Sequence, residues 1–332
     1  MATVKVKNIS SVKDTPFYNR IGHTKTSRHI SAPLYFDDYM CAQIEQMKRD
    51  NRWGTSKNYE KVLANFSLFM HGRKLPLHMF NEQIVTEYNS YLIGRGLIRN
   101  SVSFYMRILR AVYNRAVRQK LVTQTHPFDN VYTGIDHTRK RAVNEQIVAA
   151  INKLNLTDDP TLALARDLFI FSYCTRGMAF VDMAYLKKDN IHNGAICYTR
   201  RKTGQMLTIR IEPVIQQIIA RYHTPLSHYI FPIITSSNEA TAYTQYTNGL
   251  NIYNRMLRKL SSMLPYSPIH LTSYTARHSW ATAARNHQVP ISVISAGMGH
   301  NSEMTTRIYL DSMENSVIDD ANNMIIGEIF RR

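Results

Sequence analysis

The segment 271–311, LTSYTARHSWATAARNHQVPISVISAGMGHNSEMTTRIYLD, constrains the fold of this chain more than any other stretch. Its apolar spacing and turn residues predict three short helices, at about 273–286, 290–296 and 302–309. Arg277 begins the first helix, His300 lies in a Met-Gly-His turn, and Tyr309 follows that histidine by nine residues. One tyrosine among the 20 of the chain carries little information. A tyrosine that follows an ordered arginine and histidine carries much more.

Length and charge indicate a two-domain protein with an anionic partner. The chain has 332 residues, enough for two domains, and its hydrophobic fraction of 44% argues against wholesale disorder. Lysines and arginines number 41 against 24 acidic residues, which gives a net charge of +17. Such an excess favours a nucleic acid as partner, with a ribosome-associated or merely basic cytosolic protein as the alternative.

Several protein classes are not expected. No apolar run follows the basic N-terminus and no apolar stretch is long enough for a bilayer, so we expect neither a signal peptide nor a membrane span. Cys41, Cys174 and Cys197 form no CxxC pair and no zinc-ligand spacing. Scattered cysteines fit a reducing cytoplasm, and we expect all of them to be buried rather than reactive.

The expected fold class is mainly α with a small β-sheet. Four regions follow one another: a basic arm at 1–29, a helical domain at 30–122, a linker at 123–144 and a second domain at 145–332. Asn81 is placed to cap a helix that ends near Gly94 and Gly96. In the second domain, segments at 195–200 and 206–211 predict a β-hairpin among helices.

The helix expected at about 100–120 is the best DNA-binding candidate in the helical domain. At about 100° per residue, four arginines gather on one side, namely Arg107, Arg110, Arg115 and Arg118. The opposite, apolar side should pack on the domain and leave them free. Cations at this spacing repel one another unless an anion lies over them, which favours a DNA-binding face. The alternative is an ordinary solvated face. In the linker, Arg139, Lys140 and Arg141 either contact phosphates or belong to a plain flexible connector.

Four segments of the second domain resemble, in order, the motifs of tyrosine recombinases, the phage-integrase family. They are TRGMAFVDMAYL with Arg176 and Asp182, YTRRKTGQ with Lys202, SYTARHSWAT with Arg277, and MGHNSEMTTRIYL with His300 and Tyr309. Each motif alone is weak, whereas four in order are specific. TRGMAFVDMAYLKK, together with Tyr274, most resembles integrase-type recombinases of the Bacteroides group. The resemblance implies an N-terminal helical core-binding (SAM-like) domain and a C-terminal mixed α/β catalytic domain.

The resemblance also implies a phosphotyrosine intermediate. The Tyr309 hydroxyl would attack phosphorus and form a 3′-phosphotyrosyl link, which allows resealing without ATP. Ionising a tyrosine at pH 7 costs about 4 kcal/mol, because its ordinary pKa is about 10. Arg176 and Arg277 would clamp the phosphate oxygens, and His300 would donate a hydrogen bond to the same phosphate. Lys202 would protonate the leaving 5′ oxygen, so the scheme needs no metal and no cofactor.

One position departs from the family pattern, which usually has histidine three residues before the second arginine. This chain has Tyr274 there. A phenol can donate or accept a hydrogen bond, but it is a poor base at neutral pH, which puts proton removal from Tyr309 in question. His278 directly follows Arg277 and is expected to be structural, because neighbours on a helix do not share a face.

Two other interpretations concern Lys202. It lies beside Arg200 and Arg201, so a solvated hairpin tip is the alternative to a catalytic lysine. The motifs Ser-x-x-Lys at 10–13 and Lys-Thr-Gly at 202–204 suggest a penicillin-recognising serine enzyme. Such enzymes are exported, whereas this sequence shows no export signal, and the serine lies in the polar N-terminal arm rather than at a buried helix start. Both points argue against this interpretation.

The expected partner is double-stranded DNA, clamped between the two domains in the bacterial cytoplasm, at the nucleoid. The resemblance implies a homotetramer on paired recombination sites and leaves room for accessory DNA-bending proteins. Apolar residues at helical spacing in 314–332 predict a C-terminal helix that docks in trans, with packing on its own domain as the alternative. The short arm favours DNA inversion or mobile-element integration and excision. A non-cleaving DNA-binding regulator and a type IB topoisomerase-like enzyme stay open as alternative functions.

Overall fold

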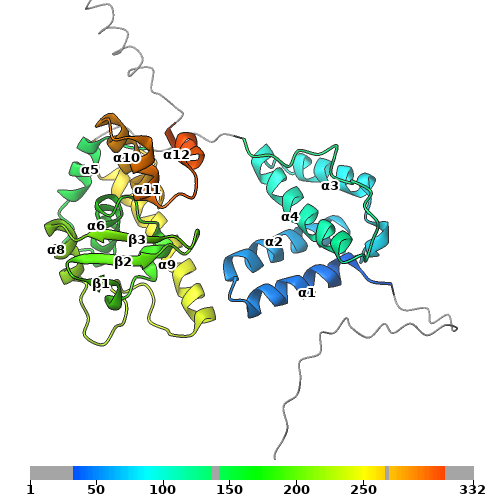
Figure 1. Ribbon diagram of the computed structural model, residues 1–332, viewed down its shortest axis with the longest axis horizontal. Helices are drawn as coiled ribbons and strands as arrows, with labels where there is room; N and C mark the ends of the chain where they lie inside the picture. Colours follow the sequence, from blue (N-terminus) through cyan, green and yellow to red (C-terminus); the bar gives the residue numbers. More distant parts are fainter. Residues whose placement is uncertain (1–32, 137–141, 266–268, 311–332) are drawn as a thin grey trace, which may run out of the picture.

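The computed structural model describes residues 33–136, 142–265 and 269–310, with side chains up to residue 307. Its elements form a helical domain and a second domain that combines helices with one small sheet (Figure 1). The fold class expected from the sequence is therefore confirmed. Within these ranges, no helix has both the length and the apolar character that crossing a bilayer requires.

The helical domain packs its helices around an aromatic core. In chain order its elements are α1 (Phe36–Arg49), α2 (Trp53–Phe69), η1 (Leu77–Met79), α3 (Glu82–Gly94) and α4 (Arg99–Arg118). Asn81 caps α3 as predicted, because its side-chain oxygen accepts a hydrogen bond from the Ile84 N–H. Leu109 on the apolar face of α4 is fully buried. Phe66 meets Tyr88 edge to face in this core, with ring centroids 5.1 Å apart.

The first part of the expected linker packs along α4. Phe128 is 5% exposed and belongs to the same aromatic core. The Arg99 guanidinium lies 3.7 Å from the centre of the Tyr132 ring, a cation–π contact between α4 and this segment. Residues 123–136 are therefore an extension of the helical domain rather than a free connector.

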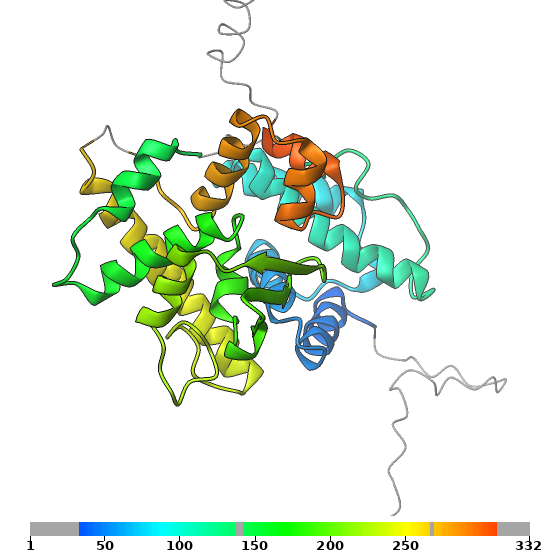
Figure 2. The ribbon, with the colours of Figure 1, turned by 60° about the vertical axis from the view of Figure 1, so that its left-hand side comes forward.

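The second domain holds the sheet. Its elements are α5 (Glu145–Asn152), α6 (Pro160–Cys174), α7 (Phe180–Ala184), η2 (Lys188–Asn190), β1 (Ile191–His192), β2 (Ala195–Thr199), β3 (Met206–Arg210), α8 (Pro213–Arg221), α9 (Glu239–Ser262), α10 (Thr275–Asn286), α11 (Ile291–Met298) and α12 (Glu303–Leu310). The strands pair antiparallel in the order β1-β2-β3, and the predicted hairpin turn joins β2 to β3. Ile196 and Leu207 are buried, because alternate side chains of a strand share a face. The end of α11 lies beside β3 (Figure 2), where Gly299 approaches Leu207.

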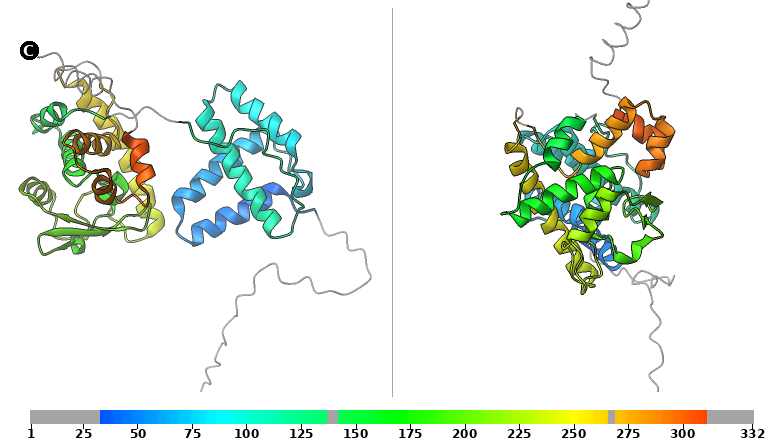
Figure 3. Two further views of the ribbon diagram at one scale, coloured as in Figure 1. Left: turned by 45° about the horizontal axis from the view of Figure 1, so that its top comes forward. Right: turned by 90° about the vertical axis from the view of Figure 1, so that its left-hand side faces the viewer.

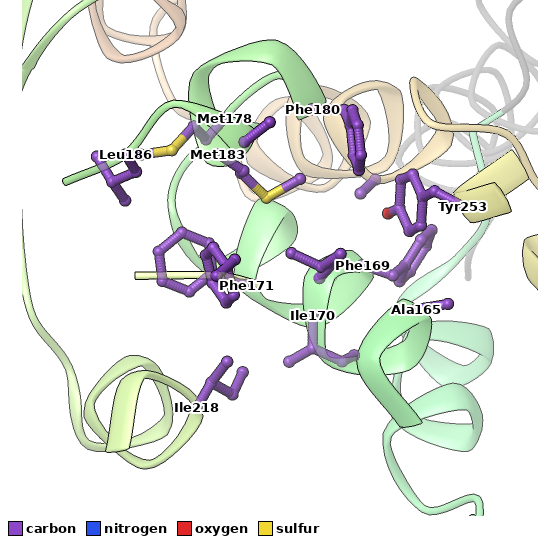
Figure 4. Packing of buried hydrophobic residues seen from close by; sticks show 14 of the residues in the cluster. Ala165, Phe169, Ile170, Phe171, Met178, Phe180, Met183, Leu186, Ile218 and Tyr253 are labelled. Atoms are coloured by element: carbon purple, nitrogen blue, oxygen red, sulfur yellow. The ribbon is translucent and has the colours of Figure 1, made fainter. Parts of the chain in front are cut away.

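The main core of the second domain surrounds α6 (Figure 4). Asp159 caps this helix with its side chain, and Pro160 occupies the first position, where its missing N–H is not needed. Phe169 points from α6 towards Tyr253 of α9, which stacks on Phe180 at a centroid distance of 4.9 Å. Each such buried side chain stabilises the domain by about 2 kcal/mol. Because these side chains anchor α6 in the core, the turn that follows α6 has a fixed position.

The last helices have a small core of their own. Ile294 and Met298 of α11 are fully buried with Ala281 of α10, and the Trp280 ring packs against them. Because α12 contacts both α10 and α11, the segment 271–310 folds as the three helices that its sequence predicts. In Figures 1 and 3, α12 lies on the side of the second domain that faces the helical domain.

Candidate active site

Arg277 is the centre of the candidate site. It lies on the first turn of α10 and is 2% exposed. Its Nη1 donates a hydrogen bond of 2.7 Å to the Gly177 carbonyl oxygen, and its Nη2 donates one of 2.7 Å to the Met298 carbonyl oxygen. A guanidinium suits this position because its planar fork presents several donors in fixed directions. Arg277 thus ties the turn after α6 to the end of α11.

The turn after α6 brings Arg176 to the same place. Arg176 and Gly177 have φ angles of +59° and +74°, in the left-handed region that arginine rarely adopts. A Cβ atom on Gly177 would lie 2.7 Å from Cγ of Arg277, so a larger residue does not fit. The half-buried Arg176 side chain passes 3.5 Å from where a Cβ on Gly297 of α11 would lie. Both arginines named as catalytic candidates therefore lie near the end of α11.

His300 follows α11 and contacts Arg277 directly. Its Nε2 lies 2.9 Å from Nη2 of Arg277, and its Nδ1 lies 2.8 Å from Oγ1 of the buried Thr306 on α12. Because a guanidinium only donates, Nε2 is the acceptor, and the ring proton on Nδ1 is donated to Thr306. Burial, followed by the charges of Arg277 and two further cations, lowers the pKa of His300 to about 4. The imidazole is therefore neutral at pH 7.

Lys202 and the helix that carries Tyr309 lie near this pair. Lys202 is exposed at the β2–β3 turn, and its charge is one of the causes that lower the pKa of His300. Tyr309 lies on α12, the helix whose Thr306 contacts His300. The side chain of Tyr309 lies outside the described residues.

Tyr274 lies at the edge of the site. It is 43% exposed and immediately precedes α10. Its ring centre is 6.2 Å from that of His278, and no hydrogen bond joins its phenol to another described residue. The phenol therefore faces solvent, where a ligand can reach it.

Two further charged residues near the site are buried, and the sequence did not predict the burial of either. Arg200, which we associated with a solvated hairpin tip, is 4% exposed, and its Nη1 donates a hydrogen bond of 2.6 Å to the Gly299 carbonyl oxygen. Asp182 is 3% exposed, and its Oδ1 accepts a hydrogen bond of 2.9 Å from the Arg201 N–H. Burial raises the pKa of Asp182, although nearby arginines oppose this. Strand periodicity could have identified Arg200, because it follows the buried alternate residues of β2.

The arginines of α4 are less free than their spacing suggested. Three of them donate hydrogen bonds of 2.6 to 3.4 Å within the helical domain, namely Arg107 to Ser103, Arg110 to Thr133 and Arg115 to Gln43. Arg118 is exposed. The expectation that all four arginines are free is therefore wrong, because the segment after α4 and α1 supply acceptors. Arg139, Lys140 and Arg141 lie outside the described residues.

Comparisons with known proteins identify relatives of both domains. The family model described as the phage integrase SAM-like domain matches residues 35–132, and the model described as the phage integrase family matches residues 142–316. The tyrosine recombinase XerD of Shewanella oneidensis is 21% identical over 284 residues, which cover 82% of this chain and 92% of that protein. XerD of Pseudomonas aeruginosa is 19% identical over 269 residues, which cover 80% and 88%.

Solved structures share the fold. The Tn1549 transposon integrase in complex with transposon right end DNA has a TM-score of 0.61 at 14% identity, with 90% of this chain and 100% of that chain covered. A lambda integrase dimer bound to a COC′ core site has a TM-score of 0.56 at 14% identity, with 83% and 77% covered. Because the two family models between them match most of the chain, this protein belongs to the phage integrase family of tyrosine recombinases, which cleave and rejoin DNA.

Proposed function

We propose that this protein is a site-specific recombinase that cleaves and rejoins double-stranded DNA, with Tyr309 as the nucleophile. The observation that carries the proposal is the Arg277–His300 pair, which lies beside the helix that holds Tyr309. A phosphodiester that enters here would offset the cost of burying a guanidinium. Preorganised cations would also stabilise the charge that develops on its oxygens during cleavage.

Cleavage would be an in-line displacement at phosphorus. The Tyr309 oxygen forms a bond to phosphorus, the bond from phosphorus to the 5′ oxygen breaks, and that oxygen takes a proton from Lys202. Lys202 suits this step because it is exposed on a turn, and because an ammonium can release a proton whereas a guanidinium cannot. Arg176 and Arg277 hold the nonbridging oxygens. Rejoining reverses these steps with a 5′-hydroxyl from the partner strand.

His300 would change its protonation during this reaction. Its Nε2 accepts a hydrogen bond from Arg277 in the DNA-free protein and carries no proton. A phosphate would draw the Arg277 guanidinium onto its oxygens and away from Nε2, and its negative charge would raise the pKa of His300, so that Nε2 takes up the phenol proton of Tyr309. The protonated ring then donates a hydrogen bond to the phosphate. Tyr274 would orient the same phosphate through its exposed phenol, in place of the histidine that is usual in the family.

DNA would be held by both domains. Arg118 on α4, together with Arg139, Lys140 and Arg141 between the domains, would contact backbone phosphates. We expect a homotetramer on paired sites, with the tail at 314–332 docked on a neighbouring protomer and with accessory DNA-bending proteins where the site requires them. The reaction would be inversion or mobile-element integration and excision, carried out at the nucleoid in the bacterial cytoplasm.

A nicked duplex tests the proposal directly. The DNA should carry a candidate recombination site, sought as an inverted repeat beside the gene, with a nick placed so that the cleaved fragment is lost and rejoining is blocked. The wild-type protein should form a covalent protein–DNA adduct, and Tyr309→Phe should form none while it binds the same DNA. Tyr229→Phe, which alters a partly buried tyrosine in the segment between α8 and α9, should form the adduct normally.

The products distinguish the alternative functions. An adduct with recombinant DNA supports recombination. Relaxed plasmid without any recombinant product favours a topoisomerase. DNA binding without an adduct favours a non-cleaving regulator. This alternative stays open because Tyr274 replaces the usual histidine and lies exposed, outside the Arg277–His300 pair.

A further inference from the structure

Arg200 is a buried cation for which the cleavage scheme has no direct use. It follows β2 and lies two residues before Lys202, with 4% of its surface exposed. A buried arginine is expensive to maintain unless its partners are well placed, and an apolar side chain of similar volume is often as stable. Its partners should therefore indicate what it does.

The first partner of Arg200 is the turn that carries His300. Its Nη1 donates a hydrogen bond of 2.6 Å to the carbonyl oxygen of Gly299, the residue directly before His300. Gly299 has a φ of +65°, and a Cβ there would lie 2.9 Å from Cδ1 of Leu207 and 3.1 Å from Cδ of Arg200. The β2–β3 hairpin and the turn of Gly299 are therefore closely packed. A displacement of Arg200 would displace the main chain that sets the His300 ring.

The second partner is Asp182 of α7. Nε of Arg200 lies 4.0 Å from Oδ2 of Asp182, and both side chains are buried. The other carboxylate oxygen accepts the N–H of Arg201, the residue after Arg200. Asp182 thus holds the main chain at the end of β2 by a hydrogen bond, and it attracts the Arg200 side chain by charge alone, without a hydrogen bond. Because α7 follows the turn of Arg176, Arg200 connects that turn region to the turn of His300.

We propose that Arg200 is a positioning residue for cleavage, which sets the place of His300 through the Gly299 carbonyl. This proposal rests on the proposed function, because His300 acts on the phosphate only if the protein cleaves DNA. Because Arg200 is buried, we assign it no contact with the phosphate and a role only through the main chain of this turn. The competing explanation is that Arg200 merely stabilises the domain.

Arg166 provides a matched control in the same domain. Its Nε donates to the buried Asp167 at 2.9 Å, and its Nη1 donates to the Leu154 carbonyl oxygen at 2.7 Å. Like Arg200, it joins one buried carboxylate to one main-chain carbonyl, but at the α5–α6 connection. Arg166→Met should therefore reproduce a purely structural loss, and Arg200→Met should add a loss specific to cleavage.

The main measurement is the single-turnover rate of adduct formation on the nicked duplex. We expect Arg200→Met to lower this rate by about 100-fold, because small displacements of catalytic groups have effects of this size. Noncovalent DNA affinity should be unchanged. Arg200→Lys keeps one charged donor and should recover part of the rate. It also replaces Arg200→Met as the test variant if the methionine variant folds poorly. If Arg200→Met and Arg166→Met lower the cleavage rate equally while they also lower the Tm equally, the proposal is overturned.

A substrate with sulphur in place of the 5′ bridging oxygen separates His300 from Lys202. A thiolate leaves without protonation, so this substrate does not need Lys202. The Arg200→Met defect should persist on it if His300 is displaced. Full rescue would place the defect at Lys202 and overturn the assignment to His300.

An NMR measurement keeps this inference separable from the proposed function. The ring signals of His300 in the DNA-free protein should shift in Arg200→Lys and stay in place in Arg166→Met. Unshifted signals in Arg200→Lys would overturn the proposal. If they shift but the wild-type protein forms no adduct on any duplex, the link from Arg200 to His300 stands and the proposed function fails.

Discussion

Arginine has contrasting surroundings in the two domains. On α4, Arg118 is exposed, and the half-buried Arg110 donates a hydrogen bond to the Thr133 hydroxyl. In the second domain, Arg277 and Arg200 are 2% and 4% exposed and donate to main-chain carbonyl oxygens. Surface cations can adapt to a ligand, whereas a buried guanidinium fixes the elements around it. We therefore expect the exposed Arg118 of α4 to tune DNA affinity, and the buried arginines of the second domain to control the rate of cleavage.

The largest effect is expected for Arg277→Lys. One ammonium cannot replace donors aimed at Gly177, Met298 and His300 together. The rate of adduct formation should fall by about 1000-fold, the scale of losing a preorganised donor to a developing oxyanion. Single-turnover cleavage of the nicked duplex measures this, with filter binding to show that DNA affinity is retained. A loss below about tenfold would remove the distinction between the two groups of arginines.

Gly177→Ala should have the next largest effect. The new Cβ would lie 2.7 Å from Cγ and 2.8 Å from Cα of Arg277, at a φ of +74°. Overpacking and left-handed strain together should lower the free energy of unfolding by about 2 to 4 kcal/mol. Gly194→Ala is the matched control, because Gly194 has a φ of +73° with nothing within 4 Å. It should lose only the strain part, about 1 kcal/mol in urea denaturation. Equal losses in the two variants would show that Arg277 tolerates displacement.

The pH dependence of stability should show a smaller effect from His300. Its pKa is about 4 in the folded protein, below the ordinary 6.5, so the unfolded chain binds the proton first as pH falls. The contribution of His300 to stability is complete above pH 6.5 and is lost as pH falls towards 4. The Tm of His300→Gln should therefore fall less steeply than that of the wild type in this window. Asp182, whose pKa is raised, titrates in both proteins and cancels. Parallel curves would mean that folding does not lower the pKa of His300.

The sequence predicted the parts of this fold that obey local rules. The Asn81 cap, the hairpin of β2 and β3 and the three helices of segment 271–310 follow from capping, turn and periodicity signals. The contact between Arg277 and His300 was expected only because both belong to an ordered set of motifs. Periodicity gave no such indication, because it assigns charged residues to solvent.

The missed parts depend on contacts that are distant in sequence. Helix α9 of the second domain was not expected, because its first half holds three threonines, Asn248 and Gly249, all poor helix formers. Packing of Tyr253 and Leu257 in the main core compensates for this. Cys41 is exposed, contrary to our expectation, because it lies on the solvent face of α1. No acceptor for Arg200 could be identified from the sequence, because Gly299 lies 99 residues away.

The smallest effect is expected on α4, and it tests the other side of the comparison. Arg118→Ala should weaken DNA binding about threefold and lower the salt dependence by about one counterion, if this exposed cation contacts a phosphate. Arg110→Ala instead removes the hydrogen bond to Thr133 and should mainly destabilise the segment after α4. Binding isotherms at several salt concentrations, with Tm measured beside them, separate the two. A salt slope that changes in Arg110→Ala and not in Arg118→Ala would reverse their roles, and would mean that DNA draws the half-buried arginines away from their partners inside the domain.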